Sequence, residues 1–231
     1  MSDAREILVL AGRRDAVALG DALGASVLRL RTDLPVPGRD VPGPFDAALA
    51  RGWSGVICAA HRFDQASGAR VAALYPDLPL VHVLGTMWGP DTEAYDTWTQ
   101  VFSVEEAVQK MPARLRVFAA TGRESEAALA AHGGPVFLRQ NHLHNEAPLA
   151  PNIRFDFATG AYDEQSEAEL FHKLGIQALL ARNIGGTRGY GKVQAARRMS
   201  LPIYMLEPRF PVGEIVPGLA GARDWALRLC G

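Results

Sequence analysis

The sequence has little cysteine, no long hydrophobic run and no excess of either charge. Two cysteines in 231 residues, Cys58 and Cys230, make no disulfide framework, so we expect both as free thiols. No stretch approaches the roughly 20 apolar residues that a membrane-spanning helix needs. The apolar run at residues 7–10 is also too short for a signal-peptide core. We therefore expect a cytoplasmic protein with no membrane partner.

The charges nearly cancel, since 24 Lys and Arg face 25 Asp and Glu, for a net charge of −1. A nucleic-acid-binding protein would show a strong basic excess, so no nucleic-acid partner is expected. At roughly 150 residues per domain, the length allows one large or two small domains. The 23 glycines and 15 prolines predict many short elements joined by tight turns.

Short apolar runs alternate with amphipathic stretches along the whole chain. The runs occupy residues 7–10, 26–30, 55–60, 80–84, 116–120, 136–138, 153–157, 178–181 and 203–206. The stretches with helical spacing include 15–23, 125–131, 164–174 and 192–199. Asp163 and Gly175 mark the start and the stop of one of these helices. Strands that alternate with helices of about ten residues predict an α/β fold with mainly parallel sheets.

The alternation runs twice, which predicts two lobes, at residues 1–98 and 99–231. The polar, turn-rich segment 85–98 is expected to be the crossing between them. Ligands of open parallel sheets bind beyond the carboxyl ends of the strands, so the residues that follow each strand are the candidates for a site.

The usual nucleotide-binding fingerprints are missing from these turns. The first turn has only Gly12 of a G-x-G-x-x-G motif, with Arg13 and Arg14 after it, so a phosphate-holding loop and a plain turn both stay open. Residues 186–192 read G-x-x-x-x-G-K, but Val193 replaces the Ser or Thr that holds magnesium in a P-loop. A metal-free nucleotide pocket beside Lys192, or a flexible surface loop, remains.

Other turns offer single candidates. His61 follows a buried strand and can donate a proton, hold an anion or simply cap a helix. The segment Thr121-Gly122-Arg123 allows a phosphate to approach the backbone, or is an ordinary tight turn. His142 and His144 share one face of an extended segment, but too few further ligands are near for a metal site, so none is predicted. Cys58 lies inside a predicted buried strand and is interpreted as a core thiol.

Several motifs together resemble the precorrin-6A reductase family of cobalamin biosynthesis, best over residues 115–209. The segment RVFAATGRE is similar to the family's strand followed by Thr-Gly-Arg. The segment ARNIGGTRGYGKVQAARRMSLPIYMLEPR resembles its Lys-Asn-Ser-Gly-Gly turn, lysine-bearing helix and Leu-Pro strand. The segment GVICAAHRFD is similar to its Asp-Ala-Thr-His-Pro-Phe motif, and RTDLPVPG to a short segment after its second strand.

The resemblance implies two Rossmann-like lobes with a ligand cleft between them. It also implies NADPH as the cofactor and hydride transfer to a polycarboxylate tetrapyrrole of the precorrin-6A type. The N-terminal lobe would take the nicotinamide and the substrate, and the C-terminal lobe the adenosine. The residues expected on the cofactor are Gly12, Thr121, Gly122, Arg123, Asn183, Gly185, Gly186 and Lys192. His61 is expected near the substrate, whose carboxylates Arg13, Arg62 and Arg188 would meet.

The departures from the family's motifs lie mostly in the N-terminal half. Ala11-Gly12-Arg13 stands where the family has Gly-Gly-Thr, and Cys58, Ala60 and Arg62 replace its Asp, Thr and Pro. They leave open a second hypothesis, a non-catalytic nucleotide- or tetrapyrrole-binding paralogue on the same scaffold. No residue is assigned as proton donor, and a homo-oligomer is possible under either hypothesis.

Overall fold

The computed structural model describes residues 6–91, 97–158, 163–187, 189–209 and 213–230. The chain forms two compact units. Unit 1 comprises Met1–Thr86 and Arg209–Gly231, and unit 2 comprises Met87–Pro208. Unit 2 is therefore inserted between the first 86 residues and the C-terminal segment of unit 1.

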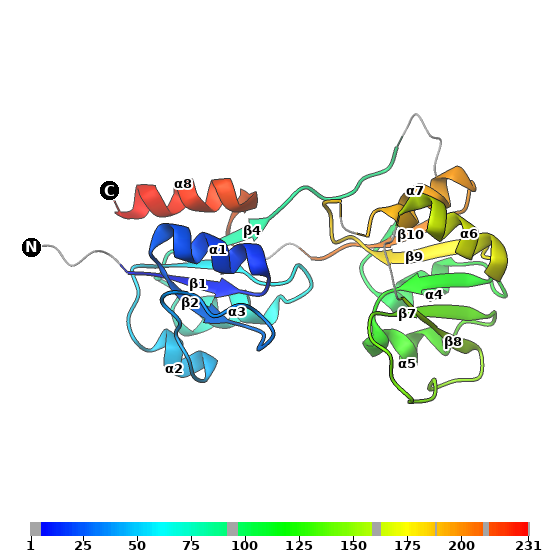
Figure 1. Cartoon of the computed structure of the whole chain (residues 1–231), viewed down its shortest axis with the longest axis horizontal. Coiled ribbons are helices and arrows are strands. Elements are labelled where there is room, and N and C mark those ends of the chain that lie inside the picture. The colour runs from blue at the N-terminus through cyan, green and yellow to red at the C-terminus, as the bar shows by residue number, and fades with distance from the viewer. Residues whose placement is uncertain (1–5, 92–96, 159–162, 188, 210–212, 231) are drawn as a thin grey trace, which may run out of the picture. The chain divides into compact units, whose positions relative to one another are not determined.

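Unit 1 has a five-stranded parallel sheet in the order β11-β4-β3-β1-β2. Its strands are β1 (Ile7–Ala11), β2 (Ser26–Arg29), β3 (Gly55–Ala59), β4 (Leu80–Leu84) and β11 (Glu214–Pro217). Its helices are α1 (Arg14–Leu23), α2 (Phe45–Leu49), α3 (Ala66–Leu74) and α8 (Gly218–Cys230). In Figure 1 this unit carries the labels α1 and α8 above the sheet and α2 and α3 below it.

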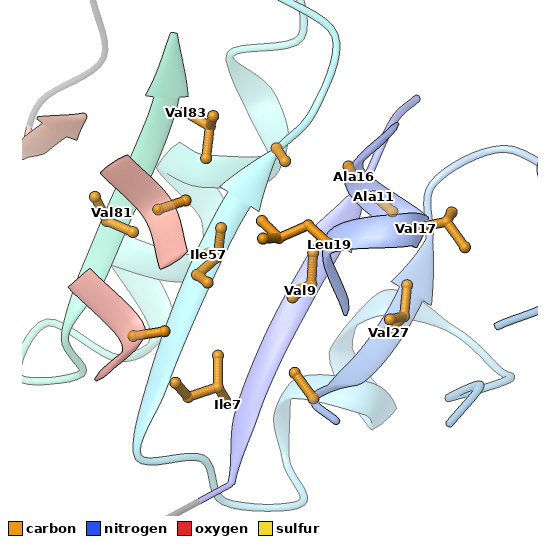
Figure 2. Packing of buried hydrophobic residues seen from close by; sticks show 14 of the residues in the cluster. Ile7, Val9, Ala11, Ala16, Val17, Leu19, Val27, Ile57, Val81 and Val83 are labelled. Atoms are coloured by element: carbon orange, nitrogen blue, oxygen red, sulfur yellow. The ribbon is translucent and has the colours of Figure 1, made fainter. Parts of the chain in front are cut away.

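Alternate residues of these strands enter two separate apolar layers. Val9, Ile57 and Val81 point to the face that α1 and α8 cover, where Leu19 packs on them (Figure 2). Leu8 and its neighbours on the opposite face pack against α2 and α3. Since both faces are buried, the strands read as continuous apolar runs, as the sequence predicted.

Unit 2 has a six-stranded parallel sheet in the order β5-β10-β9-β6-β7-β8. Its strands are β5 (Trp98–Val101), β6 (Val117–Ala120), β7 (Val136–Gln140), β8 (Ile153–Phe157), β9 (Ala178–Arg182) and β10 (Ile203–Leu206). Its helices are α4 (Val104–Lys110), the 3-10 turn Arg123–Ser125 that leads into α5 (Glu126–Leu129), α6 (Glu164–Leu174) and α7 (Gly191–Arg198). Phe118, Leu179 and Met205 form a core with Phe171 of α6 and Val193 of α7.

The predicted signals for the start and stop of α6 are confirmed. The side chain of Asp163 accepts a hydrogen bond from the backbone N–H of Ser166, and Gly175 ends the helix at a φ of 63°. The fold class is also confirmed, since both sheets are parallel and have helices interleaved between their strands. Among the described residues, no helix is long and apolar enough to cross a bilayer.

The structure differs from the predicted lobes in where it places the C-terminal segment. Residues 209–231 were expected in the second lobe, but β11 pairs with β4, and Trp225 of α8 enters the core of unit 1. Residues 87–98 were expected in the first lobe, but Trp88 is buried in the core of unit 2, and Trp98 starts β5. Local patterns reveal strands and helices, but the choice of sheet depends on pairing between distant segments.

Candidate functional site

In unit 1, the first turn and the segment after β3 meet at the carboxyl edge of the sheet. The backbone N–H of Gly12 donates to the carbonyl oxygen of Ala59 over 3.1 Å. A Cβ atom at Gly12 would lie 2.6 Å from the backbone N of His61 and 2.9 Å from Ala60, so no larger residue fits without a backbone shift. The glycine of the first turn is thus explained by close packing against the backbone before His61.

A small cavity of about 30 Å³ opens at the same edge of unit 1. It is lined from β3 and the following segment, from β4, and from the C-terminal segment. Its lining residues are Cys58, Ala60, His61, Arg62, Asp64, Gln65, His82, Val83, Leu84 and Arg209. His61 and Arg62 among them were predicted from the sequence to lie near the substrate, and the structure brings both to this cavity.

The side chains around the cavity differ in how firmly they are held. His61 is exposed, and its Nδ1 accepts the N–H of Phe63 over 3.3 Å, which leaves the proton of the neutral ring on Nε2. His82 is buried against α3, where a Cβ atom at Gly68 would come within 2.3 Å of its ring. The carboxylate of Asp64 accepts hydrogen bonds from the N–H and the hydroxyl of Ser67.

Cys58 is a core thiol, as the sequence predicted. Burial raises its pKa to about 11, so it stays protonated near neutral pH and is a poor nucleophile. Both cysteines are free, which agrees with the expectation from the sequence.

Arg13 is another arginine that was predicted for the substrate. It precedes α1 and pairs with Asp15 over 2.9 Å, and its neighbour Arg14 is exposed in the first turn of that helix. Neither residue lines the cavity. Arg188 lies outside the described residues.

In unit 2, the turn after β6 is rigidly built. Thr121 is fully buried, and its hydroxyl lies 2.7 Å from that of Ser125, which donates to the carbonyl oxygen of Gly122 over 2.6 Å. Gly122 has a φ of 86°, a conformation that favours glycine. The turn therefore keeps its shape through its own hydrogen bonds.

Arg123 projects from this turn between two carboxylates. Its Nε donates to Glu126 over 3.0 Å, its Nη2 pairs with Glu146, and its guanidinium lies 5.9 Å from the ring of Phe155. Glu146 and Glu126 raise the pKa of Arg123, and the guanidinium in turn lowers the pKa of Glu146. An anionic ligand of Arg123 would have to replace the exposed carboxylate of Glu146.

In the sheet of unit 2, β9 is the neighbour of β6, so the glycine-rich turn after β9 follows the strand next to β6. Arg182 at the end of β9 pairs with Glu124 in the turn after β6. Gly185, Gly186 and Gly189 have φ values of 60°, 65° and 74°. Three glycines in the left-handed region turn the backbone sharply before α7 begins at Gly191. The two turns predicted for a cofactor thus meet at one edge of the sheet.

Asn183 fixes the start of the glycine-rich turn. It is fully buried, its Oδ1 accepts the N–H of Trp88 over 3.0 Å, and its Nδ2 donates to Trp88 O over 2.7 Å and to the carboxylate of Glu207. The indole N–H of Trp88 also donates to the carbonyl oxygen of Gly186 over 2.6 Å. Neither Trp88 nor Glu207 was predicted from the sequence, since Trp88 lies 95 positions from Asn183 and Glu207 follows a different strand, 24 positions away.

Lys192 reaches back into this turn from α7. Its Nζ donates to the carbonyl oxygen of Gly189 and lies 5.7 Å from the ring of Trp88. Burial lowers its pKa to about 8, and Arg139 adds to this effect while Glu167 opposes it. The ammonium is therefore a charge that the fold holds at some cost and that an anion would stabilise.

His144, one of the two histidines after β7, packs among aromatic rings. The ring of His144 packs edge-on against Phe155 and Phe157, and Glu146, the nearest further ligand, pairs with Arg123. Among the described residues, no group of three His, Cys, Asp or Glu side chains is placed to hold a metal ion.

Comparisons with known proteins agree on one family. The family model for "Precorrin-6x reductase CbiJ/CobK" matches residues 46–226. A precorrin-6A reductase of Rhodobacter capsulatus is 30% identical over 190 residues, covering 80% of this chain and 75% of the relative. One from Rhodococcus erythropolis is 26% identical over 240 residues, covering 95% and 96%. A solved structure of CobK precorrin-6A reductase is 27% identical, with a TM-score of 0.74 over 97% of this chain and 96% of that chain.

Proposed function

Because the chain belongs to the precorrin-6x reductase family CbiJ/CobK, we propose that it reduces a precorrin-6A-type tetrapyrrole with NADPH. The observation that carries the cofactor assignment is the pair of turns after β6 and β9 in unit 2. These turns offer backbone groups at left-handed glycines, a guanidinium and a buried ammonium at one edge of a parallel sheet. This donor set suits the phosphates of a dinucleotide.

Each residue of this edge has a role in the proposal. Gly122, Gly185 and Gly186 allow close approach of the phosphates to the backbone. Arg123 takes the 2′-phosphate, whose charge and geometry suit a guanidinium. Lys192 takes a phosphate beside the glycine-rich turn.

Thr121 and Asn183 act as positioning residues. Their side chains are fully buried and already bonded within unit 2, to Ser125 and to Trp88 with Glu207. They hold the two turns in the shape that the cofactor needs.

Unit 1 takes the nicotinamide and the substrate in this proposal. Gly12 lets the first turn lie against β3, and His61 and Arg62 stand beside it at the carboxyl edge. Arg13 supplies a further cation near the substrate's carboxylates. When bound, NADPH supplies the hydride, and the protein's residues bind and orient the two reactants.

Titration of the purified protein with NADPH tests the cofactor assignment. Saturable binding, followed by fluorescence or thermal shift, is expected, and no response at millimolar NADPH would refute the assignment. If NADPH binds but precorrin-6A never causes its oxidation, the chain is a nucleotide-binding paralogue without this activity.

A further inference from the structure

Gln140, the last residue of β7, has a buried amide that the fold leaves unpaired. The residue is only 7% exposed, and its Nε2 makes no hydrogen bond among the described residues. Buried polar side chains are nearly always hydrogen-bonded, because an unpaired donor has lost its hydrogen bonds to water without replacing them. The end of β7 therefore holds an N–H donor that an oxygen atom of a ligand would satisfy.

The pairing of β7 with β8 shows which face of the sheet Gln140 lies on. Gln140 pairs with Phe157, and since side chains alternate along a strand, Phe155 lies on the same face. The residues between them, Arg139 and Asp156, form an ion pair on the opposite face. Gln140 thus lies beside two phenylalanine side chains at the carboxyl edge of the sheet.

Two further N–H donors pack on the same phenylalanines. The guanidinium of Arg123 is 5.9 Å from the centre of the Phe155 ring. The ring of His144 is 4.9 Å from that of Phe155 and 5.1 Å from that of Phe157. Nδ1 of His144 accepts the N–H of Glu146, so the neutral ring carries its proton on Nε2. Within the part of the chain that the structure describes, this buried Nε2 has no partner either.

The place of Gln140 in the sheet indicates which part of a dinucleotide it would meet. The strand order β8-β7-β6-β9-β10 is that of a doubly wound dinucleotide-binding sheet, with β6 as the first strand and β7 as the second. In such sheets a residue roughly 20 positions beyond the first glycine turn contacts the 2′ position of the adenosine ribose, and an acidic residue there binds a free 2′-hydroxyl. Gln140 has this place relative to Gly122.

We propose that Gln140 is a specificity-determining residue, whose Nε2 donates to the 2′-phosphate of the dinucleotide. The inference rests on the proposed function, which supplies the dinucleotide. A carboxylate at this position would repel a 2′-phosphate, whereas the amide is neutral and can donate to it. Rotation about the terminal bond of the side chain is enough to turn the amide toward a ligand at the edge. Arg123 and His144 are the neighbouring donors.

Fluorescence titration of the intact protein with NADPH and NADH tests this role. Gln140→Leu keeps the length of the side chain but removes the donor, so the Kd for NADPH should rise about tenfold and that for NADH should hardly change. Gln109→Leu is the matched control, since Gln109 is exposed at the end of α4, and both Kd values should stay as in the wild type.

Gln140→Glu tests the same contact with a side chain of nearly the same shape. Its carboxylate accepts from a 2′-hydroxyl and repels a 2′-phosphate, so the preference for NADPH over NADH should fall by more than in Gln140→Leu. Competition of 2′,5′-ADP and of AMP against NADPH locates the effect. Only 2′,5′-ADP should lose affinity in Gln140→Leu, because the two probes differ only in the 2′-phosphate.

Thermal denaturation without nucleotide distinguishes this role from a structural one. Gln140→Leu removes an unpaired buried donor, so it should melt at the temperature of the wild type or above it. A lower melting temperature with an unchanged ratio of the two Kd values would make Gln140 a structural residue and overturn the proposal.

The remaining outcomes separate this inference from the proposed function. If the wild type binds NADPH and both Gln140 variants keep its preference over NADH, the role of Gln140 is refuted and the cofactor assignment stands. If the wild type binds neither nucleotide, the cofactor assignment and the role of Gln140 are both refuted.

Discussion

The carboxyl edges of the two sheets are built in different ways. In unit 2, Thr121 and Asn183 are fully buried and bonded, and several glycines with positive φ shape the turns. In unit 1, the corresponding edge has Gly12, an exposed His61 and a small cavity. The edge of unit 2 is thus held by buried hydrogen bonds of its own side chains, whereas the edge of unit 1 presents an exposed histidine beside a cavity.

The largest expected effect is the loss of Asn183 from unit 2. Asn183→Ala leaves the N–H and carbonyl groups of Trp88 without their partner inside the protein. We expect the free energy of unfolding to fall by about 3 kcal/mol, since each unsatisfied buried polar group costs about 1–3 kcal/mol. Urea denaturation followed by tryptophan fluorescence measures this loss.

Two controls show whether the difference between the units holds. Asn145→Ala removes an exposed asparagine of unit 2, and His61→Ala removes the exposed histidine of unit 1. Both should change the free energy of unfolding by less than about 0.5 kcal/mol. An equal loss in His61→Ala and Asn183→Ala would contradict the view that Asn183 stabilises its unit while His61 does not.

The next effect concerns the close packing of Gly12 in unit 1. In Gly12→Ala the added methyl group would overlap the backbone at Ala60 and His61, and relief of this overlap should cost about 1–3 kcal/mol. Thermal denaturation should show the loss, whereas Gly38→Ala, where a Cβ atom meets only ordinary contacts, should melt like the wild type. A stable Gly12→Ala variant that has lost only ligand binding would assign the glycine to the ligand instead.

A substitution at Arg123 tests the proposed cofactor site through the affinities for NADPH and NADH. Arg123→Ala should raise the Kd for NADPH about tenfold and that for NADH much less, because only NADPH carries the 2′-phosphate. Fluorescence titration with both nucleotides measures the ratio, and Arg154→Ala on the exposed side of β8 is the control. Equal weakening of both nucleotides would refute this role of Arg123.

Glu146 provides a test of opposite sign for the same contact. Glu146→Gln removes the carboxylate that pairs with Arg123, so NADPH should bind more tightly, by about two- to threefold for an exposed pair. Weaker binding in this variant would show that Glu146 holds Arg123 in place rather than competing with the phosphate.

Lys192 predicts a pH dependence. Its pKa is lowered to about 8, so its charge is lost as the pH rises through 8, and the affinity for NADPH should fall between pH 7 and 9. The effect on stability has the opposite sign. Between pH 8 and 10.5, Lys192 binds more protons in the unfolded chain than in the folded one. Its contribution to the free energy of unfolding therefore rises as the pH rises from 8 toward 10.5.

Lys192→Met separates these effects from those of other groups. NADPH affinity should become flatter with pH in this variant, while Lys173→Met, on the exposed side of α6, should keep the wild-type profile. An unchanged slope in Lys192→Met would exclude Lys192 as the group that titrates.

The sequence predicts local structure well where the residues of a single short segment determine it. The apolar runs at residues 116–120 and 178–181 correspond to β6 and β9, and the cap at Asp163 gives the start of α6. Both glycine-bearing turns of unit 2 could also be placed at strand ends from the sequence. These features depend on spacing and turn chemistry within a few residues.

The features of the fold and the site that could not be predicted from the sequence depend on contacts between distant segments. The return of β11 to the sheet of unit 1 is one example, and it brings Arg209 to the cavity of His61 and Arg62. The hydrogen bonds that join Asn183 to Trp88 are another, since those residues lie 95 positions apart. Single-sequence patterns carry no signal for such pairs.

The most direct test of the account is a coupled measurement of cofactor and product. Protein, NADPH and precorrin-6A are mixed without oxygen, and NADPH absorbance and the mass of the tetrapyrrole are followed together. The account predicts that NADPH is consumed in proportion to a tetrapyrrole that gains a hydride and a proton. An unchanged tetrapyrrole in the presence of bound NADPH would contradict it.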